Sequence, residues 1–243
     1  MRRRHALLAL AFTGACGVAL SIPVLRRIRL RRSGGRTVRE AVQLYRDQVH
    51  LRLMPRFKQA GVTYPPEQLV LLGLKEERLL EVWAKQDAGF VCIHRYPILK
   101  ASGRPGPKLR EGDRQVPEGH YRICGMNPNS SYHLSMKLDF PNVFDLEHAR
   151  AEGRDQPGSD IFIHGKAVSI GCLAMGDPTI EELFVLVHEV GFRNVEVLLV
   201  PYDPRVRPLE VPEHAPAWLP GLYRDLTQAF EPYHSGRDTQ VDF

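Results

Sequence analysis

The chain has 243 residues, a hydrophobic content of 43% and a formal net charge of +5, which fit one globular domain with a terminal appendage. Nine arginines and no acidic residue lie within residues 1–36, so residues 37–243 carry a net charge of −4. The basic excess therefore lies outside the part that is expected to fold, and this distribution argues against a nucleic-acid partner.

An uncharged stretch of twenty residues, 6–25, lies between two groups of arginines. Twenty helical residues span about 30 Å, the thickness of the hydrocarbon core of a bilayer. We expect residues 1–36 to be a signal or membrane anchor with a basic linker. Three forms stay open: an uncleaved anchor, a signal peptide cleaved near Ala19, and a lipoprotein signal modified at Cys16. Six arginines follow the stretch and three precede it, which conflicts with export under the positive-inside rule.

Residues 37–66 are expected to be a helical segment, with an amphipathic helix over 37–60 that ends near Gly61. Its apolar side chains recur at helical spacing, at Val38, Val42, Tyr45, Val49, Leu53 and Phe57. Short apolar runs separated by turns rich in glycine, proline and asparagine then predict strands over residues 69–74, 79–85, 90–96, 119–124, 132–138 and 161–165.

A second helix is predicted from Asp177 as N-cap, through Pro178 in the first turn, to Gly191 at its end. A strand over 195–203 and a C-terminal helix within 215–234 follow. The expected fold is mainly β with appended helices. It comprises a β-rich domain over residues 67–205 and a helical extension over residues 206–243.

The four cysteines are Cys16, Cys92, Cys124 and Cys172, and they include no C-x-x-C pair. The ten histidines add no zinc-site spacing, so no metal site is predicted. Cys92 and Cys124 lie in predicted strands, where we expect small buried side chains. A disulfide between them stays open, because the sequence does not show whether their geometry fits.

A histidine and a cysteine flank a short loop in IFIHGKAVSIGCLAMGD, residues 161–177. His164 ends a predicted strand, and Gly171 allows a tight turn before Cys172. A cysteine attacks as its thiolate, so we expect His164 to act as a base and to lower the pKa of the thiol. The amides of residues 171 and 172 would face a developing oxyanion. The spacing alone leaves open a buried cysteine beside an unrelated histidine.

Strand-His-Gly followed by Ser-x-Gly-Cys resembles the active-site signature of the L,D-transpeptidase catalytic domain, a bacterial family that crosslinks peptidoglycan through a cysteine. Upstream, GPKLREGDRQVPEGHYRI (106–123) and MNPNSSYHLSMKLDFPN (126–142) resemble murein L,D-transpeptidase-like proteins of Gram-negative bacteria. The resemblance covers about residues 69–205. It implies that residues 67–205 form an L,D-transpeptidase-type β-rich catalytic domain.

The resemblance implies a role for each residue of the motif. Cys172 matches the nucleophile, His164 the base, the Gly165 carbonyl the group that orients the imidazole, and the amides of Gly171 and Cys172 the oxyanion hole. The family's Ser/Thr-His-Gly-Cys-Ile/Val-Arg becomes SIGCLA over residues 169–174, which lacks the histidine and the arginine. Arginine is the natural partner of a substrate carboxylate, so the donor, the acceptor or the outcome is expected to differ from crosslinking members.

The candidate substrate-binding residues are Ser169, Tyr132 and His133. For Ser169 a hydrogen bond within the loop, and for His133 a structural hydrogen bond, are the alternatives. One loop carries three basic residues that could meet an acidic peptide stem, although a solvated loop face is the favoured interpretation: Lys108, Arg110 and Arg114.

We therefore expect a periplasmic enzyme, held at the membrane through its N-terminal segment or exported by a signal peptide, whose substrate is a peptidoglycan stem peptide. Cys172 attacks the carbonyl of the diaminopimelate L-centre and forms a thioester, and an acceptor amine or water resolves it. No metal or organic cofactor is implied. One alternative is an amidase that releases a peptidoglycan-linked lipoprotein, and another is a wall-binding protein with a silent site. Because Ile170 and Ala174 replace polar residues, we expect transfer and hydrolysis of the thioester to be nearly equally favoured, with hydrolysis slightly ahead.

Overall fold

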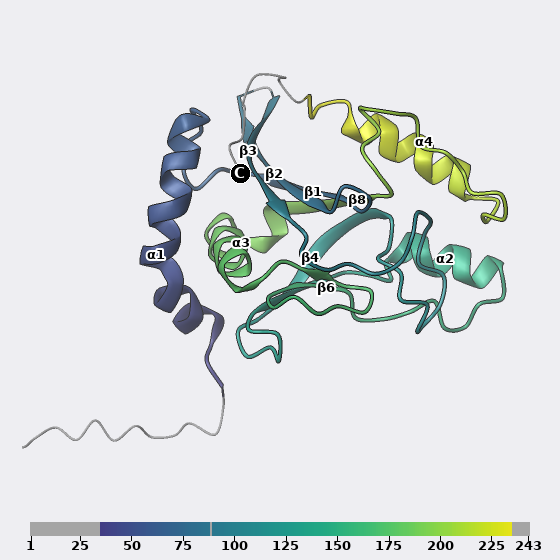
Figure 1. The fold of residues 1–243 in the computed structure, drawn as a ribbon, viewed down its shortest axis with the longest axis horizontal. Coiled ribbons are helices and arrows are strands. Elements are labelled where there is room, and N and C mark those ends of the chain that lie inside the picture. The colour runs from purple at the N-terminus through teal and green to yellow at the C-terminus, as the bar shows by residue number, and fades with distance from the viewer. Residues whose placement is uncertain (1–34, 88, 235–243) are drawn as a thin grey trace, which may run out of the picture. The chain divides into compact units, whose positions relative to one another are not determined.

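The computed structural model describes residues 35–87 and 89–234. In this part of the chain a curled mixed sheet of eight strands carries four α-helices (Figure 1). The expected fold class, mainly β with appended helices, is confirmed. The predictions for the apolar stretch 6–25 lie outside the described residues. Within the described part, no helix is long and apolar enough to cross a membrane.

The sheet is curled and its strands run in a mixed order. In chain order its strands are β1 (Leu69–Leu74), β2 (Leu79–Gln86), β3 (Gly89–Pro97), β4 (Gly119–Asn127), β5 (Ser135–Leu138), β6 (Phe162–His164), β7 (Leu173–Ala174) and β8 (Val195–Val200). In space the order is β3-β2-β1-β8-β4-β5-β6-β7, and only the pairs β1–β8 and β6–β7 are parallel. Lys100, three residues after the end of β3, forms an isolated bridge with Ala174 of β7, so the segment that follows β3 reaches the other edge strand.

The helices are α1 (Val38–Gln59), α2 (Val143–Ala151), α3 (Asp177–Val190) and α4 (Leu219–Phe230). A capping box between Thr37 and Glu40 begins α1 one residue after the predicted start. The N-cap of α3 is Gly176, so the prediction that Asp177 caps this helix is wrong. The Asp177 carboxylate instead accepts the amide of Lys166 at 2.8 Å, which ties the preceding loop to the helix.

Helices cover both faces of the central strands. Alternate residues of β1 belong to two different cores: Leu69 and Leu71 pack in the core that includes α1 and α3, and Val70 and Leu72 pack in the core that includes α4. Figure 1 shows α1 beside α3 and, across β1 and β8, α4. Coverage of both faces explains why β1 is apolar at every position.

Two sequence predictions in the sheet are corrected. The strand predicted over residues 132–138 begins only at Ser135, because His133 has a φ of 74° in a turn. Cys124 is exposed rather than buried, and it is unpaired, as is Cys92. Strands β2, β1 and β8 separate the strands of these two cysteines, so the open question of a disulfide is answered by the sheet order.

Candidate active site

His164 stands at the end of β6, between β5 and β7, and is only 2% exposed. Its Nδ1 lies 2.6 Å from the carbonyl oxygen of Gly165. A carbonyl oxygen only accepts, so Nδ1 carries the proton and Nε2 keeps a free lone pair. Burial lowers the pKa of His164 below its usual value despite the opposing effect of the Gly165 hydrogen bond. The ring is therefore a neutral base at neutral pH.

Two features beside His164 shape the space around its ring. The ring of Tyr132, which is 44% exposed, lies 4.6 Å from the imidazole between centroids. A Cβ on Gly165 would meet the Tyr132 carbonyl oxygen at 2.6 Å and the Asp177 carboxylate at 2.7 Å. Glycine at position 165 thus permits its segment to pass close to the segments that carry Tyr132 and Asp177. The ring of Tyr132 lies where it can cover the imidazole of His164.

Cys172 is half-buried at the end of the loop that follows β6, directly before β7. Strands β6 and β7 are parallel, with His164 opposite Ala174. Strand β7 comprises only Leu173 and Ala174, so Cys172 lies one residue before it, two residues before the position opposite His164. The predicted nucleophile and base are thus attached to two adjacent, hydrogen-bonded strands, with His164 at the end of β6 and Cys172 just before β7.

The thiol of Cys172 rests against the segment that precedes β6. It donates to the Asp160 carbonyl at 3.8 Å, and within the described residues no hydrogen bond joins it to His164. Burial raises the pKa of Cys172 above its usual value; a backbone hydrogen bond from Phe162 and the charge of Lys108 lower it, and the charge of Asp160 raises it. The expectation that His164 lowers the pKa of this thiol is wrong in the resting structure.

The two amides expected to form an oxyanion hole are both occupied by serine hydroxyls. Gly171, with a φ of 92°, donates its amide to Ser102 Oγ at 2.7 Å. Cys172 donates its amide to Ser169 Oγ at 2.9 Å, and that hydroxyl donates to the Cys172 carbonyl at 2.6 Å. Ser169 is thus a hydrogen-bonding residue of the loop here. An oxyanion would have to displace these hydroxyl oxygens.

His133 is directed to the helices rather than to His164. Its Nε2 lies 2.8 Å from Glu181 Oε1 on α3, and its ring meets Tyr45 of α1 edge-on at 5.5 Å. His133 therefore makes a structural hydrogen bond in this structure. Its neighbour Tyr132, by contrast, packs against the ring of His164.

Residues 67–197 match the family of the L,D-transpeptidase catalytic domain (YkuD), over just more than half of the chain. The chain belongs to this family. The matched part contains seven of the eight strands completely and the first half of β8, and it includes His164 and Cys172. It ends within β8 and excludes α1 and α4, so the two outer helices lie outside the matched residues.

Relatives of this L,D-transpeptidase domain include two Escherichia coli proteins, from strain K12 and from O157:H7, each named "Putative L,D-transpeptidase YafK". Each is 38% identical over 133 residues, which are 53% of this chain and 52% of the relative. The chain thus spans about half the length of these curated relatives.

Among solved structures, two similar chains share little sequence with the protein. The helical cell shape determining protein Pgp2 of Campylobacter jejuni is 22% identical over 56% of this chain and 48% of its own, with a TM-score of 0.45. Bd1075 of Bdellovibrio bacteriovorus is 20% identical over 70% and 57%, with a TM-score of 0.41. Likeness at this level supports no inference about the site.

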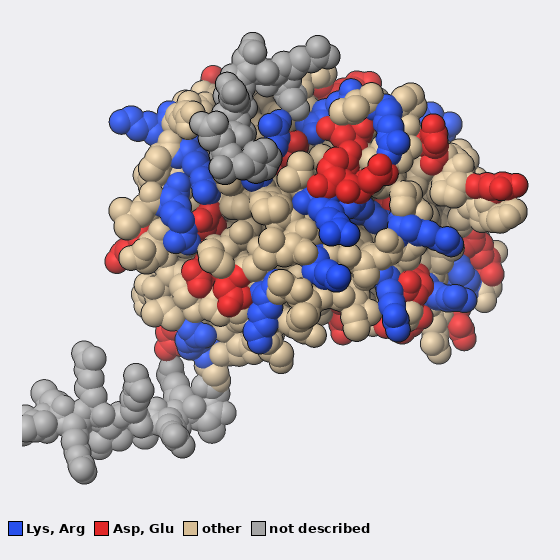
Figure 2. Space-filling model, in the orientation of Figure 1, with Lys and Arg blue, Asp and Glu red and all other residues tan. Residues whose placement is uncertain are grey.

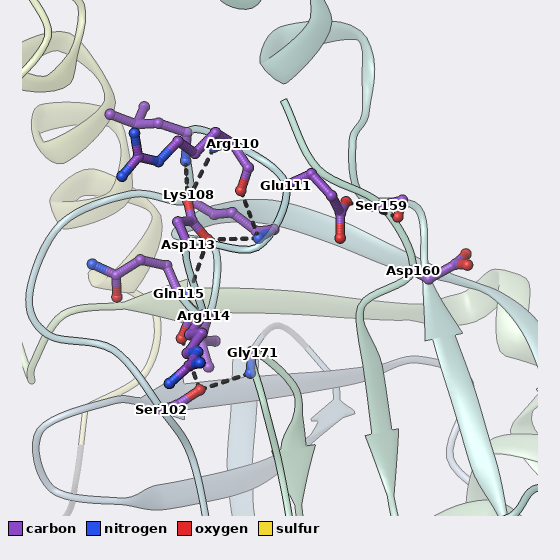
Figure 3. A network of polar contacts seen from close by, with 12 residues as sticks. Ser102, Lys108, Arg110, Glu111, Asp113, Arg114, Gln115, Ser159, Asp160 and Gly171 are labelled. Atoms are coloured by element: carbon purple, nitrogen blue, oxygen red, sulfur yellow. Dashed lines mark hydrogen bonds and ion pairs between the residues drawn. The ribbon is translucent and has the colours of Figure 1, made fainter. Parts of the chain in front are cut away.

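Sequence reasoning missed the role of the loop over residues 102–116. Arg110 and Arg114 are exposed, as a solvated face requires, but the Lys108 side chain is only 4% exposed. Asp113 holds the loop: its carboxylate accepts the Lys108 ammonium at 2.6 Å and three backbone amides, at 2.9 Å, 3.0 Å and 3.0 Å (Figure 3). The sequence signal available for this buried ion pair was a lysine and an aspartate within one loop bounded by glycines.

Over the rest of the face seen in Figure 2, basic and acidic side chains are intermixed.

Proposed function

We propose that this L,D-transpeptidase-family protein is a cysteine-dependent enzyme that acts on peptidoglycan stem peptides through a thioester. The observation that supports it most is the placement of a neutral, oriented imidazole and a thiol beside two adjacent parallel strands of the matched domain. Neither side chain carries a charge at rest, since the pKa of His164 is lowered and that of Cys172 is raised. The pair therefore fits general-base catalysis rather than a preformed ion pair.

In the proposed reaction the Cys172 thiol turns from the Asp160 carbonyl to Nε2 of His164 and gives up its proton. The sulfur attacks the carbonyl carbon of the diaminopimelate L-centre, and the amides of Gly171 and Cys172 receive the oxyanion once the serine hydroxyls have moved. The imidazolium then protonates the leaving amine as the carbon–nitrogen bond breaks. An acceptor amine or water attacks the thioester, and the thiol is regenerated.

Hydrolysis is the second candidate outcome, and the surface around Cys172 favours it. Ile170 is 74% exposed at the loop and Ala174 is fully buried, so neither position offers a group that holds a carboxylate. A transferase must hold its acceptor amine well enough to outcompete water at about 55 M, which requires well-placed binding groups. On this reading the enzyme releases an amine-linked partner, such as a peptidoglycan-linked lipoprotein, to water.

The test supplies the purified full-length protein with tetrapeptide muropeptides, with and without an added amine acceptor, and separately with a peptidoglycan–lipoprotein conjugate. Products are identified by mass, with Cys172→Ala as the control. Crosslinked or amine-exchanged products would establish transfer, and free lipoprotein without exchange would establish hydrolysis. Absence of any product, or equal product from Cys172→Ala, would refute the proposal and leave a wall-binding role.

The proposal places the domain in the periplasm, where peptidoglycan lies, with the N-terminal segment serving as an anchor or a signal. This placement conflicts with the arginine bias around residues 6–25, and charge bias is a tendency that single proteins break. Alkaline phosphatase fused after Phe243 should be active and an ordinary fluorescent protein dark. The opposite pattern would place the domain in the cytoplasm and would therefore also rule out peptidoglycan as its substrate.

A further inference from the structure

Lys108 carries an ammonium group that is buried yet incompletely paired. Its Nζ donates to Asp113 Oδ1 at 2.6 Å and to the Arg110 carbonyl at 3.0 Å (Figure 3). A lysine ammonium has three N–H donors, so within the described residues one donor lacks an acceptor. Burial of an ammonium costs free energy, and a structural anchor for the loop needs no charge beyond the Asp113 pair.

The tip of Lys108 lies against the segment that also borders the nucleophile. A Cβ on Gly158 would lie 2.5 Å from Lys108 Cε and 3.3 Å from its Nζ, so glycine permits the approach. Two residues further on, the Asp160 carbonyl accepts the Cys172 thiol at 3.8 Å. The ammonium of Lys108 and the thiol of Cys172 therefore border the same short segment, at Gly158 and at Asp160.

The charged groups around Cys172 differ in sign and in burial. Asp160, from the segment before β6, is 63% exposed and paired with Lys137 of β5 at 2.6 Å. His164, on β6, is neutral, and the Asp113 carboxylate, on the loop 102–116, accepts from Lys108 and from three backbone amides. Lys108 is the buried cation of the set. Consistently, its charge lowers the pKa of Cys172, although burial has the larger, opposite effect.

We propose that Lys108 is a positioning residue for the nucleophile: its buried ammonium, fixed by Asp113, favours the thiolate of Cys172. A fixed charge acts more strongly in a poorly solvated site than in water, so it can act without touching the sulfur. The inference rests on the proposed function in one respect, that Cys172 is the nucleophile. It assigns to a loop lysine part of the electrostatic role that the sequence suggested for His164.

The test is the pH dependence of iodoacetamide alkylation at Cys172 in the full-length protein, read by peptide mass. Lys108→Gln keeps hydrogen-bonding groups and removes the charge; it should move the profile up by about half to one pH unit and slow alkylation about three- to tenfold below the midpoint. Lys108→Arg should restore the parent profile. Arg110→Ala, which removes an exposed cation of the same loop, should leave the profile unchanged.

Asp160→Asn provides a control of opposite sign, since loss of its negative charge should move the profile to lower pH. Thermal unfolding shows that each variant is folded, and Lys108→Met replaces Lys108→Gln if the latter is not. An unmoved profile in the folded Lys108 variant, or one in Lys108→Arg that matches Lys108→Gln, overturns the proposal. Turnover of muropeptides by Cys172→Ala would instead refute the proposed function, so the two failures are distinguishable.

Discussion

The interface between α1 and α3 and the site around Cys172 treat polar groups in opposite ways. At the interface, Glu182 of α3 is 3% exposed, and its carboxylate accepts from Arg52 and Arg56 of α1 and from the Tyr96 hydroxyl. At the site, the thiol and the imidazole are uncharged; the thiol donates to the Asp160 carbonyl, and the imidazole donates to the Gly165 carbonyl. Charge is thus concentrated where two helices are held together, and it is absent from the two groups proposed to react.

Stability and reactivity therefore depend on different groups, although the two regions are adjacent in sequence. Helix α3 starts five residues after Cys172, and α1 lies outside the residues that match the family. Removing a group from the interface should therefore weaken the fold. Removing a group from the site should abolish chemistry with little effect on the fold.

The largest expected effect is that of Cys172→Ala on turnover. Loss of the nucleophile should lower muropeptide turnover by about 10,000-fold or more. The thermal midpoint should change little, because the side chain is small and only half-buried. Turnover assays and thermal unfolding of the same preparation measure both, and a variant that unfolds would remove the separation between the two regions.

His164→Ala should lower turnover by about 100- to 10,000-fold, the range associated with loss of a general base. In the parent enzyme, turnover should fall only when the pH drops below the ordinary histidine range, because burial lowers the pKa of His164 and the ring stays neutral longer. At the alkaline side turnover should keep rising, since the pKa of Cys172 is raised. An acid limb above pH 6.5 would contradict the neutral resting pair.

Glu182→Ala should destabilise the fold by about 3–5 kcal/mol, because Arg52 and Arg56 would lose their buried partner. The matched control is Glu76→Ala, which breaks an ion pair with Arg207 in which both side chains are half-exposed and which should cost less than about 1 kcal/mol. Urea unfolding compares the two variants. Similar losses for both would show that the buried interface does not hold the fold as described.

The smallest expected effect is acid destabilisation through His94. Burial, aided by the charge of Arg56, lowers its pKa to about 4 in the folded protein, below the ordinary value near 6.5. The unfolded chain therefore binds the proton first, so stability is full above pH 6.5 and is lost as pH falls towards 4. His94→Gln should remove about 1 kcal/mol of this loss, a figure discounted for the half-exposed ring. Unfolding at pH 7 and pH 4.5 measures it, and an identical loss in both proteins would refute the assignment.

Patterns that depend on a single element were predictable. The spacing of apolar residues predicted α1, and the run LVLLGL predicted β1, because each element determines its own periodicity. The placement of His164 and Cys172 about one loop followed from a strand end and a glycine turn. Helix α2 was missed because it buries only Ala149, which leaves no apolar face to detect; its capping box between Asn142 and Asp145 was the remaining signal.

Features that depend on distant segments were not predictable. The burial of Lys108 depends on Gly158, fifty residues away, and on the way Asp113 closes its loop. The raised pKa of Cys172 likewise depends on burial by other segments, which the local sequence does not specify. Asp177 has the composition of an N-cap, but the amide of Lys166 takes its carboxylate because the preceding loop folds back.

A thioester at Cys172 would be detected by intact-protein mass spectrometry during turnover of a tetrapeptide stem. The mixture is quenched in acid within seconds, and the modified peptide is then sequenced. We expect a mass increase equal to the donor less its leaving amine, located on Cys172 and absent from Cys172→Ala. An adduct on another residue, or product formed by the Cys172→Ala protein, would contradict it.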